Sequence, residues 1–100
     1  MIKLVVFDWN GTILSDTMAC MDSDNHLIKF FGGKPVDLKT YRDTVIIPSN
    51  SFYARHGCRM DIIAKQSNRL GQFHSFYEER AKKCRTRKGA KEILEWLHSN

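Results

Sequence analysis

Residues 2–7, Ile-Lys-Leu-Val-Val-Phe, restrict most strongly what this chain can fold into. A short run of apolar and β-branched residues is typical of a strand that is covered on both faces, as inside a parallel sheet. Such a strand needs neighbours, because its buried backbone N–H and C=O groups must be paired. No second run of this kind follows in the sequence, so the chain predicts one strand without an evident partner.

The apolar run stops at Asp8, and an Asn-Gly-Thr turn sequence follows one residue later. Ligands of open α/β sheets bind at the carboxyl ends of the strands, which is where Asp8 falls. Asp8 is therefore a candidate nucleophile, and Gly11 would let the backbone turn sharply beside it. The alternative is ordinary turn chemistry, since Asn-Gly is a common turn dipeptide.

The rest of the chain has helical patterning. Apolar residues recur near helical spacing from Ser15 to Phe31, and Gly32 and Gly33 then end the helix. Asp24 and Asn25 interrupt the apolar face, which predicts a kink or a partly wet surface there.

Shorter helices are predicted next. Asp37 is the expected N-cap of a helix that reaches Val45. A second helix is predicted from Pro48 to His56, closed by Gly57.

Three further helices complete the chain. Two successive apolar faces predict consecutive helices hinged near Gly71, and Lys88 to His98 predict a last amphipathic helix. The two faces consist of Met60, Ile63, Ala64 and Ser67, and of Leu70, Phe73, Tyr77, Ala81 and Cys84.

Composition indicates one soluble globular domain, because the 100 residues are 42% hydrophobic and 27% charged. No apolar run approaches the roughly 20 residues that span a bilayer, and Asp8 interrupts the N-terminal run too early for a signal sequence. We therefore expect a cytoplasmic protein without a membrane partner. Cys20, Cys58 and Cys84 are widely spaced and lack any C-x-x-C pair, so reduced thiols are expected.

The net charge of +5 is concentrated in residues 80–91, which contain seven basic residues and no acid. A solvated surface is the ordinary explanation of such a run, and an anionic partner is the alternative. Nucleic-acid binding is not predicted, because neither interleaved aromatic residues nor a known motif accompanies the charge.

The stretch FDWNGTILSD resembles the first motif of the haloacid dehalogenase superfamily of hydrolases, written D-x-D-G-T-[LIV]-x-D. Its position after a predicted strand and before a predicted helix strengthens the resemblance. Asn10 departs from the pattern, which has an aspartate there. The residues that carry the resemblance are Asp8, Gly11, Thr12, Ile13 and Asp16.

The resemblance implies a role for each residue of the loop. Asp8 would attack phosphorus to form an aspartyl-phosphate and would also ligate Mg²⁺. Asn10, at the position of the acid/base residue, could ligate Mg²⁺ only through its backbone carbonyl, because an amide cannot transfer the proton. Gly11 would bring backbone N–H groups to the phosphoryl oxygens, and Thr12 would fix this substrate-binding loop.

The fold implied by the resemblance is α/β, with a Rossmann-like core and an inserted helical cap, similar to phosphoglycolate phosphatases. Residues 1–15 would be the first core strand and nucleophile loop, 16–85 the cap, and 86–100 the return helix. The remaining motifs would lie beyond Asn100. The chain itself is thus expected to be mostly helical and to be the N-terminal half of the enzyme.

The expected function is Mg²⁺-dependent hydrolysis of a small phosphorylated metabolite. The substitution at Asn10 leaves dehalogenation and P–C bond cleavage open as other chemistries of the superfamily. An inactive fragment or paralogue that acts as a binding module is the alternative from a different class. A chain that ends here could also form a homodimer through pairing of residues 2–7.

Overall fold

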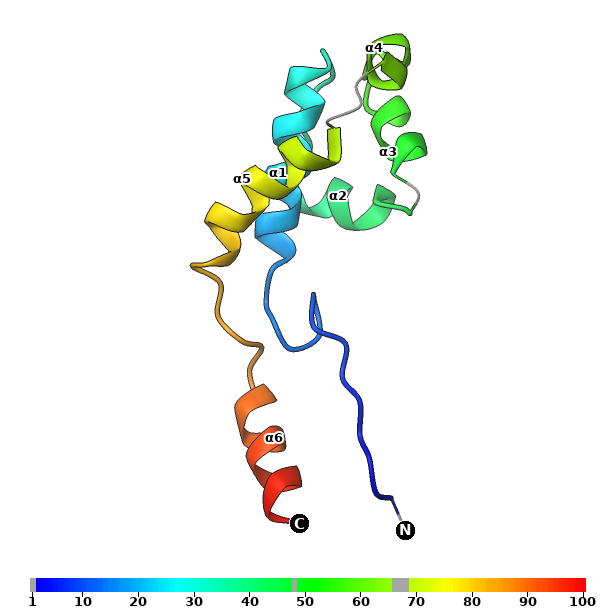
Figure 1. Ribbon diagram of the computed structural model, residues 1–100. Helices are drawn as coiled ribbons and strands as arrows, with labels where there is room; N and C mark the ends of the chain where they lie inside the picture. Colours follow the sequence, from blue (N-terminus) through cyan, green and yellow to red (C-terminus); the bar gives the residue numbers. More distant parts are fainter. Residues whose placement is uncertain (1, 48, 66–68) are drawn as a thin grey trace.

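The computed structural model describes residues 2–47, 49–65 and 69–100, and most of this part of the chain is helical (Figure 1). The described residues form no β-strand. The expectation of a mostly helical chain is thus confirmed. The helices are α1 (Thr17–Phe30), α2 (Leu38–Thr44), α3 (Asn50–Arg55), α4 (Met60–Lys65), α5 (Arg69–Ala81) and α6 (Ala90–Ser99).

Helix α1 packs against α5 and contacts α2, and it confirms the first predicted helix. Its buried stripe includes Ala19, Leu27 and Ile28, and α5 packs along it (Figure 1). The helix ends at Phe30, after which Gly32 adopts φ +81° and lets the chain reverse.

The two short helices after α1 confirm their predicted positions. The carboxylate of Asp37 accepts a hydrogen bond of 2.8 Å from the N–H of Thr40, as an N-cap residue does at the start of α2. Helix α3 is followed by Gly57 at φ +84°. Pro48, the predicted start of that second helix, lies outside the described residues.

The predicted hinge near Gly71 is wrong, because Gly71 lies inside α5. A glycine inside a helix costs only about 1 kcal/mol relative to alanine. Here the side chains of Phe73, Phe76 and Tyr77 supply packing that keeps the helix continuous. Ser67, which the sequence placed on the preceding apolar face, lies outside the described residues.

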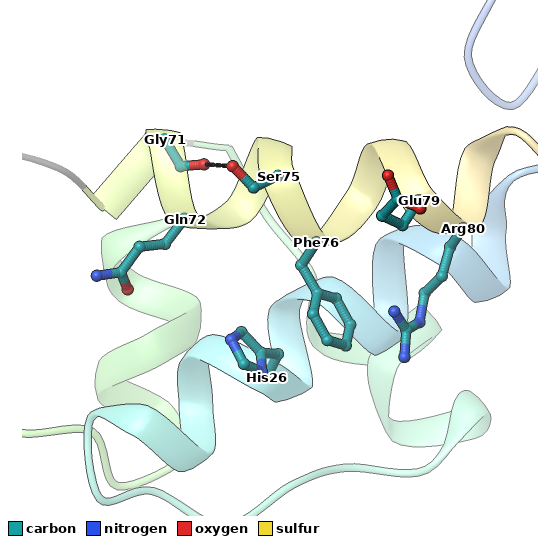
Figure 2. A pocket seen from close by; sticks show the side chains of 7 residues that line it. All are labelled: His26, Gly71, Gln72, Ser75, Phe76, Glu79 and Arg80. Atoms are coloured by element: carbon teal, nitrogen blue, oxygen red, sulfur yellow. Dashed lines mark hydrogen bonds between the residues drawn. The ribbon is translucent and has the colours of Figure 1, made fainter.

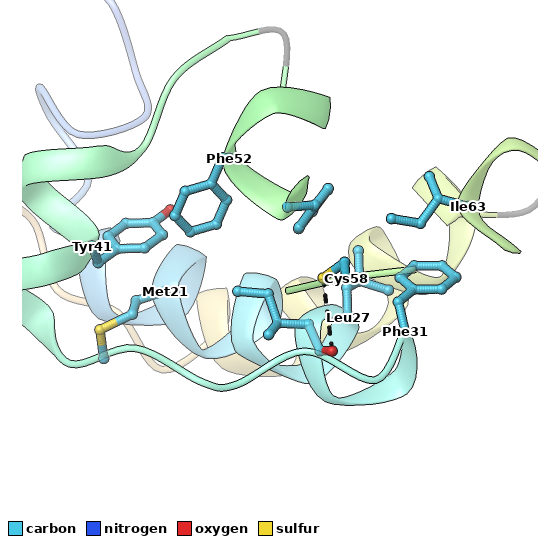
Figure 3. Close-up of a cluster of buried hydrophobic side chains, with 9 residues drawn as sticks. Met21, Leu27, Phe31, Tyr41, Phe52, Cys58 and Ile63 are labelled. Atoms are coloured by element: carbon cyan, nitrogen blue, oxygen red, sulfur yellow. Dashed lines mark hydrogen bonds between the residues drawn. The ribbon is translucent and has the colours of Figure 1, made fainter. Parts of the chain in front are cut away.

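One hydrophobic cluster forms the core between α1, α2, α3 and α4 (Figure 3). Phe52, which is 1% exposed, contacts the rings of Tyr41, Tyr53 and His56. The members of the cluster are Met21, Leu27, Ile28, Phe31, Tyr41, Phe52, Tyr53, Cys58 and Ile63.

Of the polar pair on α1, Asp24 is buried, contrary to the predicted partly wet surface, whereas Asn25 is half-buried. Asp24 is buried and accepts hydrogen bonds from the hydroxyls of Tyr41 and Tyr53. Asn25 donates to the carbonyl of Val36 at 2.9 Å and accepts from its N–H at 2.8 Å. These partners lie far along the chain, so the helical pattern of α1 could not reveal them.

Residues 2–7, predicted as a strand, form no strand, because no described segment pairs with their backbone. They run extended beside α6, away from the other helices (Figure 1). The radius of gyration is 16.8 Å, against about 13 Å for a compact domain of this length, so these two segments lie outside the packed body. The α/β core implied by the resemblance is not shown.

Helix α6 confirms the last predicted helix, and Gly89 precedes it at φ +86°. Its apolar stripe, however, remains largely exposed: Ile93 and Leu94 are each 42% exposed, and Ala90 is buried. Among the described helices, none has the length and apolar character needed to cross a membrane.

The close contact between the ends of α1 and α3 predicts the effect of Gly33→Ala. A Cβ at Gly33 would lie 2.6 Å from the backbone carbonyl oxygen of His56 and 2.9 Å from a methyl carbon of Ile28. We expect a loss of about 1–3 kcal/mol in the free energy of unfolding, measured by urea denaturation. Gly71→Ala in α5 is the matched control and should cost nothing, because alanine favours helix. Equal stability of both variants would contradict this packing.

Candidate functional site

The loop after Asp8 is a closed turn built around one carbonyl group. The carbonyl oxygen of Trp9 accepts hydrogen bonds from the N–H groups of Thr12, Ile13 and Leu14 at 3.3, 3.0 and 2.9 Å. Gly11 adopts φ +76°, a conformation that other residues rarely take, and its N–H donates to the carbonyl of Leu14 at 3.0 Å. The sharp turn predicted at Gly11 is therefore present.

The segment before α6 holds this loop in place. The backbone N–H of Arg87 donates to the carbonyl of Ile13 at 2.7 Å, and its side-chain Nε donates to the carbonyl of Gly11 at 2.6 Å. The N–H of Ser15 donates to the carbonyl of Arg85 at 2.8 Å. Residues 15 and 85–87 thus join the two ends of the helical region, and at least one side chain of the basic run has a specific partner.

Asp16, at the start of α1, is the buried centre of the site. Asp16 is only 2% exposed. Its Oδ2 accepts hydrogen bonds from Tyr77 Oη at 2.6 Å and from Asn10 Nδ2 at 2.9 Å. The thiol of Cys20 lies 3.6 Å from the same oxygen. Counted strictly, the family pattern places its last acid at Ser15, so Asp16 stands one position later.

These hydrogen bonds control the charge of Asp16. Burial acts to raise the pKa of the carboxyl, but the bonds from Tyr77, Asn10 and Cys20 outweigh it, and the pKa lies below its ordinary value of 3.8. Burial and the same carboxylate raise the pKa of Cys20 to about 12 and also raise that of Tyr77. At neutral pH Asp16 is therefore an anion held by neutral donors.

The predicted site residues Asp8, Asn10, Gly11 and Thr12 lie together on the loop, but their side chains have different partners. Asp8 is exposed, and its Oδ1 accepts the N–H of Trp9 at 2.8 Å. The amide of Asn10 is directed to Asp16 and Tyr77, with Nδ2 2.7 Å from Tyr77 Oη. The N–H groups of Gly11 and Thr12 are used inside the loop, so their contact with phosphoryl oxygens stays a prediction.

The loop contains oxygen atoms of the type that bind hard cations such as Mg²⁺. Asp8 Oδ2 and the backbone carbonyl of Asn10 accept no hydrogen bond from the residues that the structure describes. Mg²⁺ is commonly bound by one or two carboxylates together with water and substrate phosphates. Within residues 2–47, 49–65 and 69–100, no group of three or more His, Cys, Asp or Glu side chains is arranged to hold a metal. The loop could therefore supply only part of a coordination shell.

A row of stacked side chains sets the position of α5, and hence of Tyr77, against α1 (Figure 2). The rings of His26 and Phe76 stack at 4.2 Å between centroids. The guanidinium of Arg80 lies 3.5 Å from the centroid of Phe76, and its Nε is 3.6 Å from a carboxylate oxygen of Asp22. One helical position beyond Phe76, Tyr77 reaches Asp16.

Sequence reasoning missed Tyr77 and Arg87 as parts of the site. Tyr77 was assigned to the apolar face of its helix, where its hydroxyl was the one signal that it needs a polar partner. Arg87 belongs to a run of basic residues, and nothing in the sequence distinguishes it from its neighbours. Both contacts span more than sixty residues.

The chain matches no family model, no curated protein and no solved structure with significance.

The network around Asp16 predicts the effect of Tyr77→Phe. Loss of the hydroxyl removes one donor from a buried carboxylate, and we expect about 1–3 kcal/mol less stability at pH 7. A lowered carboxyl pKa stabilises the fold above the ordinary value of 3.8, and this stabilisation is lost as the pH falls below it. The deficit of the variant should therefore shrink below about pH 3.8, as urea denaturation across pH would show.

Tyr53→Phe is the matched control, because the Tyr53 hydroxyl donates to Asp24 and not to Asp16. NMR titration should show a raised pKa for Asp16 in Tyr77→Phe and an unchanged one in Tyr53→Phe. The same Asp16 pKa in Tyr77→Phe and wild type would show that this hydrogen bond does not form in solution.

Proposed function

We propose that this chain carries the nucleophile of a hydrolase of the haloacid dehalogenase superfamily, which acts on a small phosphorylated metabolite. The observation that carries the proposal is the turn from Trp9 to Leu14, which follows Asp8 directly and is held by Arg87. A fixed turn beside an exposed carboxylate is what an attacking group requires, because a positioned nucleophile avoids much of the entropic cost of reaction. The motif resemblance supplies the chemistry.

In the proposed reaction a carboxylate oxygen of Asp8 attacks phosphorus and an O–P bond forms. The bond from phosphorus to the ester oxygen breaks, and that oxygen leaves with the electron pair and takes a proton from solvent. Water then hydrolyses the aspartyl-phosphate, which restores Asp8 and releases inorganic phosphate. When bound at Asp8 and the carbonyl of Asn10, Mg²⁺ would neutralise phosphate charge.

Asn10 favours a second candidate function. Its amide cannot act as an acid or base, and in this structure it already bonds Asp16 and Tyr77. Without a proton-transfer group beside Asp8, the chain would serve as a binding module of the same ancestry. The two candidates differ in whether Asp8 ever becomes phosphorylated.

The test is Asp8→Asn in the complete protein, assayed with Mg²⁺ and a panel of phosphomonoesters. We expect turnover to fall by at least roughly a thousand-fold, as when other enzymes lose their nucleophile, while the circular dichroism spectrum stays unchanged. Asp61→Asn, which alters an exposed carboxylate paired with Arg59, is the control and should retain activity.

Mass spectrometry of wild-type protein quenched during turnover should show one added phosphoryl group, sensitive to hydroxylamine, on the peptide that contains Asp8. Unchanged turnover in Asp8→Asn would refute the nucleophile. Absence of both turnover and phosphorylation in the wild type would favour the binding module.

A further inference from the structure

The buried carboxylate of Asp24 accepts hydrogen bonds from two tyrosine hydroxyls. It lies in the middle of α1 and is 7% exposed. Its Oδ1 accepts the hydroxyl of Tyr53 at 2.6 Å, and its Oδ2 accepts that of Tyr41 at 2.8 Å. It takes part in no ion pair within the described ranges. Buried charges in proteins are normally paired with an opposite charge, so this arrangement is unusual.

A cavity of about 240 Å³ opens onto this carboxylate. Its walls come from α1, α2, α3, α5 and residues 45–47 and 49, and they are almost entirely apolar. Among the residues that the structure describes, no lysine, arginine or histidine lines it. Ile46 and Ile47, at 53% and 93% exposed, also line it, so the cavity has an apolar edge open to solvent. Mostly apolar cavities with one or two fixed polar groups are the usual form of small-molecule sites.

The polar atoms of the cavity can accept hydrogen bonds from a ligand. A carboxylate oxygen has two lone pairs, and each oxygen of Asp24 uses one for a tyrosine hydroxyl. These oxygens accept no further side-chain hydrogen bond from the described residues, so two acceptor positions remain for a donor. Tyr41, Tyr53 and Phe73 provide aromatic walls, which attract cations as well as apolar groups (Tyr41 and its neighbour Phe52 are drawn in Figure 3).

We infer that this cavity binds a small apolar amine in its ammonium form, with Asp24 as the counter-ion. The ammonium supplies the charge that the fold does not, and its N–H groups fill the open acceptor positions. The hydrocarbon part replaces water against Leu27 and Phe73. The inference does not rest on the proposed hydrolase activity, because none of these side chains belongs to the loop after Asp8.

A metal ion does not explain the cavity. Among the described residues that line it, Asp24 is the one carboxylate and Cys20 the one thiol, and two such ligands are fewer than a protein metal site usually has. A neutral apolar molecule would use the walls but would leave Asp24 without a counter-charge.

Calorimetric titration of the intact protein with n-butylammonium and with n-butanol tests the inference. Both probes have the same hydrocarbon chain and differ in charge. We expect the amine to bind with a Kd of roughly millimolar or tighter and at least about tenfold more tightly than the alcohol. In Asp24→Asn this preference should disappear. Asp43→Asn, which alters an exposed carboxylate paired with Lys39, should keep it.

NMR of the wild type tests the inference without relying on the folding of Asp24→Asn. Butylammonium should shift the ring signals of Tyr41, Tyr53 and Phe73 and leave those of Trp96 in α6 unchanged. Equal binding of amine and alcohol by the wild type would identify an apolar cavity without charge recognition and overturn the inference. Absence of these ring shifts, or an amine preference that survives Asp24→Asn, would overturn it as well.

Discussion

The hydrogen bonds to the buried carboxylate of Asp16 connect the loop after Asp8 to the helices. They join the loop after Asp8 through Asn10, the first turn of α1 through Cys20, and α5 through Tyr77. A buried anion is costly unless donors surround it, and the N-terminal end of a helix adds a favourable dipole. Because Asp16 has both, the loop can be fixed against the helices without any strand beside it.

Helix α1 carries two buried carboxylates whose surroundings act in opposite directions. Asp16 sits at the start of the helix with three donors, and its pKa is lowered. Asp24, two turns further along, has two tyrosine donors, and burial raises its pKa. The hydrogen bonds to Asp16 stabilise its anion, whereas the two hydrogen bonds to Asp24 do not fully offset the effect of burial on its pKa. Helix α1 thus contains both Asp16, which anchors the loop, and Asp24, which lines the cavity.

The helices could be predicted from local patterns because their causes are local. Asp37 caps its helix three residues away, and glycines with positive φ end α1 and α3. The strand at residues 2–7 could not form, since a strand depends on a partner and none is present in the described part of the chain. The partners of Asp16 and Asp24 were equally hidden, because tyrosines up to sixty-one residues away supply them.

The candidate site could be predicted as a set of positions but not as an arrangement. The motif placed Asp8, Asn10, Gly11 and Thr12 on one turn, and the sharp turn at Gly11 is present. The contact of that turn with Arg87 depends on how the helices bring residue 87 back to the N-terminal loop. Spacing along the sequence contains no information on that return, so Arg87 could be seen only as one charge in a basic run.

The motif that this loop resembles has an aspartate where this chain has Asn10. The contact of Asn10 with Asp16 gives a physical reason for the difference. The amide nitrogen of Asn10 lies 2.9 Å from Asp16 Oδ2, where it donates a hydrogen bond to an ionised carboxylate. An aspartate in this rotamer would place a second carboxylate against the first, and two such groups cannot both be ionised at that distance without a large cost. The asparagine therefore suits a loop that is anchored through Asp16. In the proposed hydrolase, an acid or base that assists Asp8 would therefore have to be a group other than residue 10.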